Sequence, residues 1–213
     1  MRKVPLVTGE YYHIYNRGVD KRVIFADHAD LNRFFICLSE FNSVEPVGSI
    51  YAKSFATKKK KYNSKRLVDF IAYCLNPNHY HLLLYQVTDG GISEFLKRLN
   101  GGYTNYFNKK HKRVGSLFQG TFRSSHVDSN EYLLHLSAYI NLNNNEFLQI
   151  PSLPSKSSWG EYIGVEKEPI CNTEIILSQF RSKHEYQEFA ESSWKDVLAR
   201  KEMLKGLESD LGV

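Results

Sequence analysis

The chain has 213 residues, of which 42% are hydrophobic, 24% charged and 14% aromatic, and this composition excludes a disordered or fibrous protein. Its net charge of +5 is unevenly distributed: residues 1–150 carry 20 Lys and Arg against 12 Asp and Glu, whereas residues 151–213 carry 8 against 11. The basic excess in the first part favours a phosphate-rich partner.

Cys37, Cys74 and Cys171 are scattered and have no Cys-x-x-Cys spacing, which argues against a disulfide framework and against a zinc knuckle. No apolar run approaches the length that spans a membrane, and the N-terminus lacks a hydrophobic signal core. We therefore expect a cytoplasmic protein without a membrane partner.

Hydrophobic periodicity and turn residues predict alternating strands and helices. In chain order we expect a strand at 10–18, a helix from 27–30 onward, a short strand at 50–56, paired strands at 67–75 and 81–86, a helix at 92–108, a strand reached through 114–127, and a helix at 130–141. The order β-α-β-β-α-β, followed by a helix, predicts an α+β fold: a ferredoxin-like (RRM-like) antiparallel sheet with helices on one face.

The composition changes at Pro151 to residues rich in Pro, Ser and Gly, followed by polar helical stretches around 173–189 and 194–207. A core formed by this segment alone would be too small to be stable. We therefore predict one domain at 1–150 and a helical C-terminal extension at 151–213 that packs on or near it.

The motif His79-Tyr80-His81 follows an Asn-Pro turn signal and precedes a run of leucines. Because alternate side chains of a strand point to the same face, His79 and His81 would project together while Tyr80 points toward the helices and anchors the strand. Two such imidazoles can bind one divalent metal ion. The alternative is a strand start with two partly exposed histidines.

Tyr139 and Asn143 are four residues apart on the last predicted helix, so they share a helix face if the helix continues one turn beyond Asn141. Asn143 offers a carbonyl oxygen to a hard metal, and Tyr139 offers a phenol as a nucleophile. In the alternative, Tyr139 packs in the core and Asn143 caps the helix. Periodicity alone does not distinguish Tyr139 from Tyr103, Tyr106 or Tyr132.

The sequence resembles the single-tyrosine HUH (His-hydrophobic-His) transposases, in particular the REP-associated tyrosine transposase branch. The resemblance is carried by ordered motifs over nearly the whole chain: Tyr12-His-Ile-Tyr-Asn-Arg-Gly18, Arg22-Val-Ile-Phe25, Ala72-Tyr-Cys-Leu-Asn-Pro-Asn-His-Tyr-His-Leu-Leu-Leu84, Tyr103-Thr-Asn-Tyr-Phe-Asn108, Gly115-Ser-Leu-Phe-Gln-Gly-Thr-Phe-Arg123, 132–143 and 157–164.

The resemblance implies that residues 1–150 form an HUH transposase-like catalytic domain that cleaves and rejoins single-stranded DNA near a hairpin. Tyr139 then matches the nucleophile, which forms a 5′-phosphotyrosine, while His79, His81 and Asn143 match the residues that hold Mg²⁺ or Mn²⁺. For phosphate contacts we expect basic residues spread over the domain, namely Arg17, Arg22, Lys58, Lys59, Lys60, Lys61, Arg66 and Arg123. The basic loop 58–66 can alternatively be a solvated loop.

The chain departs from the family pattern at Asn76, where a Met or similar residue usually precedes Pro-Asn-His. An alternative to the enzyme is a hairpin-DNA-binding protein derived from a transposase that does not cleave. An RNA-binding module on the same kind of sheet is a third possibility, but no RNP-like aromatic motif is evident. The resemblance allows a monomer or a homodimer, with Tyr139 acting in its own chain or in a partner.

Overall fold

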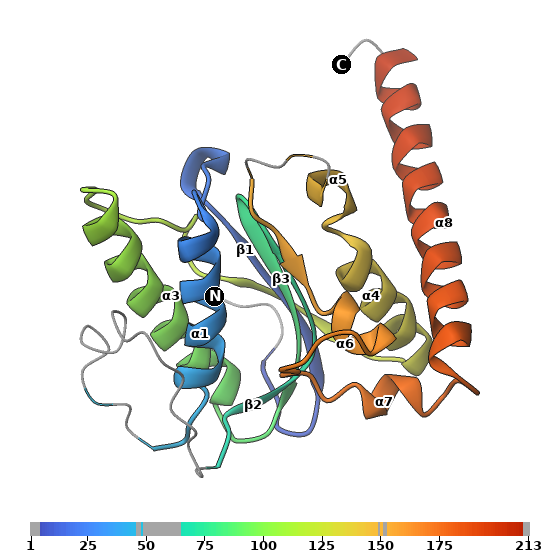
Figure 1. Cartoon of the computed structure of the whole chain (residues 1–213), viewed down its shortest axis with the longest axis horizontal. Helices are drawn as coiled ribbons and strands as arrows, with labels where there is room; N and C mark the ends of the chain where they lie inside the picture. The colour runs from blue at the N-terminus through green and yellow to red at the C-terminus, as the bar shows by residue number, and fades with distance from the viewer. Residues whose placement is uncertain (1–4, 46–47, 49–64, 149, 151–152, 211–213) are drawn as a thin grey trace.

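The computed structural model describes residues 5–45, 48, 65–148, 150 and 153–210, and it forms three layers with a sheet between two sets of helices (Figure 1). The elements are β1 Tyr11–Arg17, η1 Val19–Lys21, α1 His28–Glu40, β2 Val68–Asn76, β3 His79–Gln86, α3 Gly91–Lys110, β4 Arg123–Val127, α4 Asn130–Leu142, α5 Asn145–Leu148, β5 Lys156–Ser157, α6 Trp159–Ile163, α7 Glu174–Leu177 and α8 Lys183–Asp210. The strand predicted at 50–56 lies outside the described residues.

The five strands pair antiparallel in the order β4-β1-β3-β2-β5, which confirms the α+β class and the antiparallel sheet. β2 and β3 form a tight hairpin in which Asn76 pairs with His79, so β3 begins two residues earlier than predicted. Pro77 and Asn78 form the turn, because proline presets the backbone angle that a turn requires.

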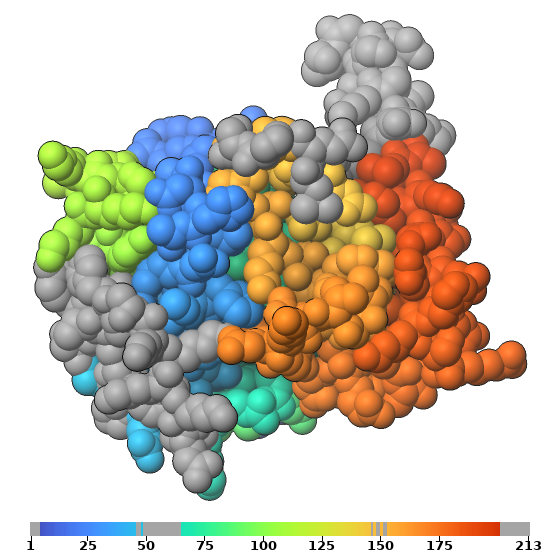
Figure 2. All heavy atoms as spheres, in the orientation of Figure 1, coloured from blue at the N-terminus to red at the C-terminus, as the bar shows by residue number. Residues whose placement is uncertain are grey.

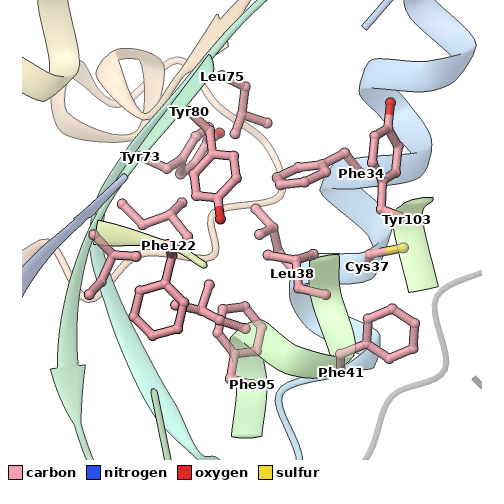
Figure 3. Close-up of a cluster of buried hydrophobic side chains, with 14 of the residues drawn as sticks. Phe34, Cys37, Leu38, Phe41, Tyr73, Leu75, Tyr80, Phe95, Tyr103 and Phe122 are labelled. Carbon is pink, nitrogen blue, oxygen red and sulfur yellow. The ribbon is translucent and has the colours of Figure 1, made fainter. Parts of the chain in front are cut away.

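One face of the sheet is covered by α1 and α3, whose aromatic side chains interlock with those of the strands (Figure 3). Phe34 meets Tyr103 edge to face at 4.9 Å between ring centroids, and Tyr80 lies 5.4 Å from Phe34. The Tyr80 hydroxyl donates a hydrogen bond to Asn100 Oδ1 of α3 at 3.0 Å. The prediction that Tyr80 points to the helices and anchors the strand is confirmed.

The opposite face is covered as well, by α4 and by the C-terminal helices, and this corrects the expectation of helices on one face. Ile71, Ala72, Cys74 and Leu83 point to that side and pack in a second core with α4, α6 and α8. The physical reason lies in β2, which is buried along almost its whole length. A strand that is apolar on both faces needs cover on both.

The C-terminal segment adds β5 to the sheet edge beside β2 and lays α8 along α4, and its colours from orange to red occupy one side of the molecule in Figures 1 and 2. Two separate helical stretches were predicted there, but residues 183–210 form one continuous helix. The division at residue 150 stays a prediction. Among the described residues no helix is both long and apolar enough to cross a membrane.

Asn42, two residues after the end of α1, holds the start of β2 in place through hydrogen bonds. Its Oδ1 accepts from the backbone N–H groups of Leu67 and Val68 at 3.0 Å each, and its Nδ2 donates to Val68 O at 2.8 Å. Asn42→Ala removes these hydrogen bonds from buried backbone groups. We therefore expect it to lower the free energy of unfolding by about 3 kcal/mol in urea titrations. The exposed Asn130→Ala should change it by less than about 0.5 kcal/mol; equal effects would contradict the assignment.

Candidate functional site

Two rows of side chains cross the sheet on the face that α4 covers. Arg123 of β4 lies opposite Tyr15 of β1, which lies opposite His81 of β3. One step along, Arg17 of β1 lies opposite His79, which lies opposite Asn76 of β2. Because directly paired residues share a face, the antiparallel register brings both histidines together with two arginines from strands distant in sequence.

His79 and His81 lie as alternation predicted, with ring centroids 5.1 Å apart and planes at 87°. The tautomer of His79 follows from its neighbours. Asn78 Nδ2 donates to Lys21 O at 3.3 Å, so Asn78 Oδ1 is the atom that faces His79 Nδ1 at 2.6 Å. An amide oxygen only accepts, so Nδ1 carries the proton and His79 Nε2 keeps a lone pair.

Asn143 is linked to His79 by the side-chain amide of Asn76. α4 ends at Leu142, but Asn143 retains helical dihedral angles (φ −64°, ψ −17°). It therefore stays on the same helix face as Tyr139, one turn further along. Its Oδ1 accepts a hydrogen bond from Asn76 Nδ2 at 2.7 Å, and the same nitrogen lies 3.1 Å from His79 Nε2. The Asn76 amide nitrogen therefore lies within hydrogen-bond distance of both His79 Nε2 and Asn143 Oδ1, two atoms of residues that the sequence predicted as metal ligands.

His13 is a site residue that the sequence reasoning missed. Its Nε2 lies 2.9 Å from His81 Nδ1, and the two rings stack at 5.1 Å with planes 23° apart. Burial lowers the pKa of His13 to about 4, so its imidazole is neutral near neutral pH. Alternation places its side chain on the same face as that of Tyr15, but the sequence does not reveal that β1 lies beside β3.

Tyr139 is half-buried and is held between two aromatic side chains of its own chain. Its ring lies edge-on to that of His81 at 5.7 Å between centroids, and the centroid of the Trp194 ring of α8 lies 6.0 Å from that of Tyr139. Trp194 is buried and was not anticipated from the sequence. The extension that carries it thus contacts the tyrosine that was predicted as the nucleophile.

A cavity of about 460 Å³ opens at this point. It is lined by residues of β1, β3, β4 and α4 and by the segment before β4, namely Tyr15, Asn16, Arg17, His79, Tyr80, His81, Gln119, Arg123 and Tyr139. Arg17 and Arg123 are exposed beside the histidines, and guanidinium groups suit phosphate oxygens. Tyr139 and Tyr15 both offer a phenol on this side of the sheet, whereas the Tyr80 hydroxyl is engaged on the other.

The other predicted DNA contacts do not converge on this cavity. Arg22 lies in a separate depression with Phe107, His111 and Arg113, and contacts Asp20 at 3.6 Å. Arg66 pairs with Asp69 at 3.2 Å beside the first residues of β2, whereas the histidines lie near its last residue. The four lysines 58–61 lie outside the described residues.

The donor set determines which metal this region could hold. Within the described part of the chain, no cluster of three or more His, Cys, Asp and Glu side chains has a metal-binding arrangement. A cation here would depend on two imidazoles and on amide oxygens. His79 Nε2, with its lone pair, and Asn143 Oδ1 both approach Asn76 Nδ2, so the residues present fit a divalent cation that accepts nitrogen and oxygen ligands together.

One solved structure and one family model resemble this chain. No curated protein matches the chain. A solved structure described as "Structure of the REP associates tyrosine transposase bound to a REP hairpin" matches with a TM-score of 0.52 and 11% sequence identity, over 80% of this chain and 88% of that chain. At this identity the likeness shows the shared fold. Residues 46–143, which contain His79, His81, Tyr139 and Asn143, match the family model "Transposase IS200 like".

Proposed function

We propose that this protein is a metal-dependent DNA strand transferase that cleaves and rejoins single-stranded DNA beside a hairpin. One observation carries the proposal: Tyr139 lies against His81 in a cavity that also holds His79, Arg17 and Arg123. A phenol, two imidazoles and two guanidinium groups match the needs of a phosphodiester that is attacked, polarised and held.

In the proposed step Tyr139 Oη attacks the scissile phosphorus. The bond between Oη and phosphorus forms as the bond from phosphorus to the 3′ oxygen breaks, which leaves a 5′-phosphotyrosine. The phenol loses its proton to solvent, and the departing 3′ oxygen takes one up to become a hydroxyl. Because the phosphotyrosine conserves the bond energy, a 3′-hydroxyl can reverse the step without ATP.

Arg17 and Arg123 would hold the phosphate at the β1–β4 side of the cavity, because each ends one of the two rows on that side of the histidines. His79, His81 and Asn143 would bind Mg²⁺ or Mn²⁺. Such a cation supplies stabilisation of negative charge on the non-bridging oxygens. Since the Tyr139 ring contacts that of His81 in its own chain, we propose that Tyr139 acts there and that a monomer suffices.

His13 would position His81 for this role. If His81 Nδ1–H donates to His13 Nε2, the lone pair of His81 lies on Nε2, the nitrogen that would bind the metal. We expect His13→Phe to weaken Mn²⁺ affinity about 10- to 100-fold in calorimetric titrations, since the acceptor is lost. His13→Gln, whose side-chain oxygen can still accept, should weaken it less. Equal affinities of His13→Phe and wild type would contradict a positioning role.

A second candidate function is a hairpin-DNA-binding protein that does not cleave. One observation favours it: the Asn76 amide already satisfies the lone pairs of His79 and Asn143 without a metal. Arg17 and Arg123 beside the cavity would then bind DNA electrostatically, and the affinity for DNA would fall steeply as salt is added.

Labelled hairpin oligonucleotides with single-stranded flanks test the two functions. With Mn²⁺, wild-type protein should form a covalent adduct that survives denaturing gel electrophoresis, and a chelator should prevent it. Hairpin binding that is independent of metal, with no adduct on any flanking sequence, would instead support the non-cleaving protein.

A further inference from the structure

Asn76 is fully buried, and its amide nitrogen stands where two proposed metal ligands converge. One N–H can donate to His79 Nε2 at 3.1 Å and the other to Asn143 Oδ1 at 2.7 Å. We propose that Asn76 is itself a ligand of the divalent cation through its Oδ1, and that its amide turns over when the cation enters. This inference rests on the proposed function and adds a residue to its metal site.

The separations of these atoms support a ligand role. Ligands about 2.1 Å from an octahedral cation lie about 3 Å apart along each edge of the octahedron. The separations of 2.7 and 3.1 Å from Asn76 Nδ2 to Asn143 and His79 are close to this edge length. If the amide oxygen replaces the nitrogen, three acceptor atoms face one point, which is favourable only when a cation occupies it.

The other end of the amide makes both orientations acceptable. Asn76 Oδ1 accepts from the Cys74 thiol at a sulfur–oxygen distance of 3.5 Å. After the amide turns over, Asn76 Nδ2 can donate to the same sulfur, which is a weak acceptor. The change needs rotation about one side-chain bond, and the β2 backbone stays in place.

Two substitutions at Asn76 separate a ligand from a hydrogen-bond donor. Asn76→Asp keeps the size and offers oxygen only, and we expect it to tighten Mn²⁺ binding about tenfold, as measured without DNA by the electron paramagnetic resonance signal of free Mn²⁺. Asn76→Leu removes the oxygen and should weaken binding at least about tenfold. Asn100→Asp on α3 adds the same charge on the other face of the sheet and should leave affinity unchanged. Weaker binding by Asn76→Asp would overturn the proposal.

A second measurement does not depend on how well the variants fold. In wild-type protein with ¹⁵N-labelled asparagine, the Asn76 side-chain amide signal should shift when Mg²⁺ saturates the site, because its protons leave His79 and Asn143. An unchanged signal at saturation would overturn the proposal. If wild type binds Mn²⁺ through His79 and His81 while the Asn76 variants match it, this inference alone fails; if wild type binds no Mn²⁺, the metal-dependent function fails with it.

Discussion

Tyr139→Phe is expected to abolish the covalent DNA adduct and to leave hairpin affinity within about twofold of wild type. The change removes the attacking oxygen and retains the ring that packs against His81 and Trp194. Adduct formation is measured on denaturing gels with labelled hairpin DNA and Mn²⁺, and affinity by fluorescence anisotropy in a chelator. Only the chemical step should be lost, because Arg17 and Arg123, which line the cavity, are unchanged.

Tyr15→Phe is the matched control, since Tyr15 lines the same cavity and its ring lies 6.0 Å from that of His81. It should form the adduct at a rate within about threefold of wild type, because the ring, its position and its neighbours are kept. Loss of the adduct in Tyr15→Phe, together with its survival in Tyr139→Phe, would move the nucleophile from α4 to β1.

The sequence predicted those parts of the site that depend on local periodicity. Alternation along one strand places His79 and His81 on one face, and spacing along one helix places Tyr139 and Asn143 together. The order of strands and helices follows from the same patterns, and it predicted the antiparallel sheet.

Residues that join the site through strand order could not be predicted in this way. His13 reaches His81 only because β1 lies between β4 and β3, and no periodicity encodes which strands are neighbours. Asn76 meets Asn143 only because α4 packs on the second face of the sheet. For Arg66, the charge in the sequence predicted a DNA contact. Because Arg66 precedes β2, however, it lies at the end of that strand that is distant from the cavity.

The double substitution His79→Ala/His81→Ala is expected to reduce Mn²⁺ affinity at least about 100-fold and to abolish the adduct, while hairpin binding in chelator persists. Both imidazoles are proposed ligands on one strand face, and no cluster of three acidic, His or Cys side chains among the described residues could replace them. Loss of the His81 partner also leaves His13 without its hydrogen bond, so thermal unfolding must be followed in parallel.

The control is His126→Ala/His184→Ala, which removes two imidazoles that pair with Glu10 and Glu188 instead. It should keep Mn²⁺ affinity and adduct yield within about twofold, because neither side chain lines the cavity. If the His79/His81 variant still forms the adduct at the wild-type rate, the metal role of the pair is wrong. If it loses hairpin binding as well, the two histidines contact DNA directly, and the cavity binds phosphate without a cation.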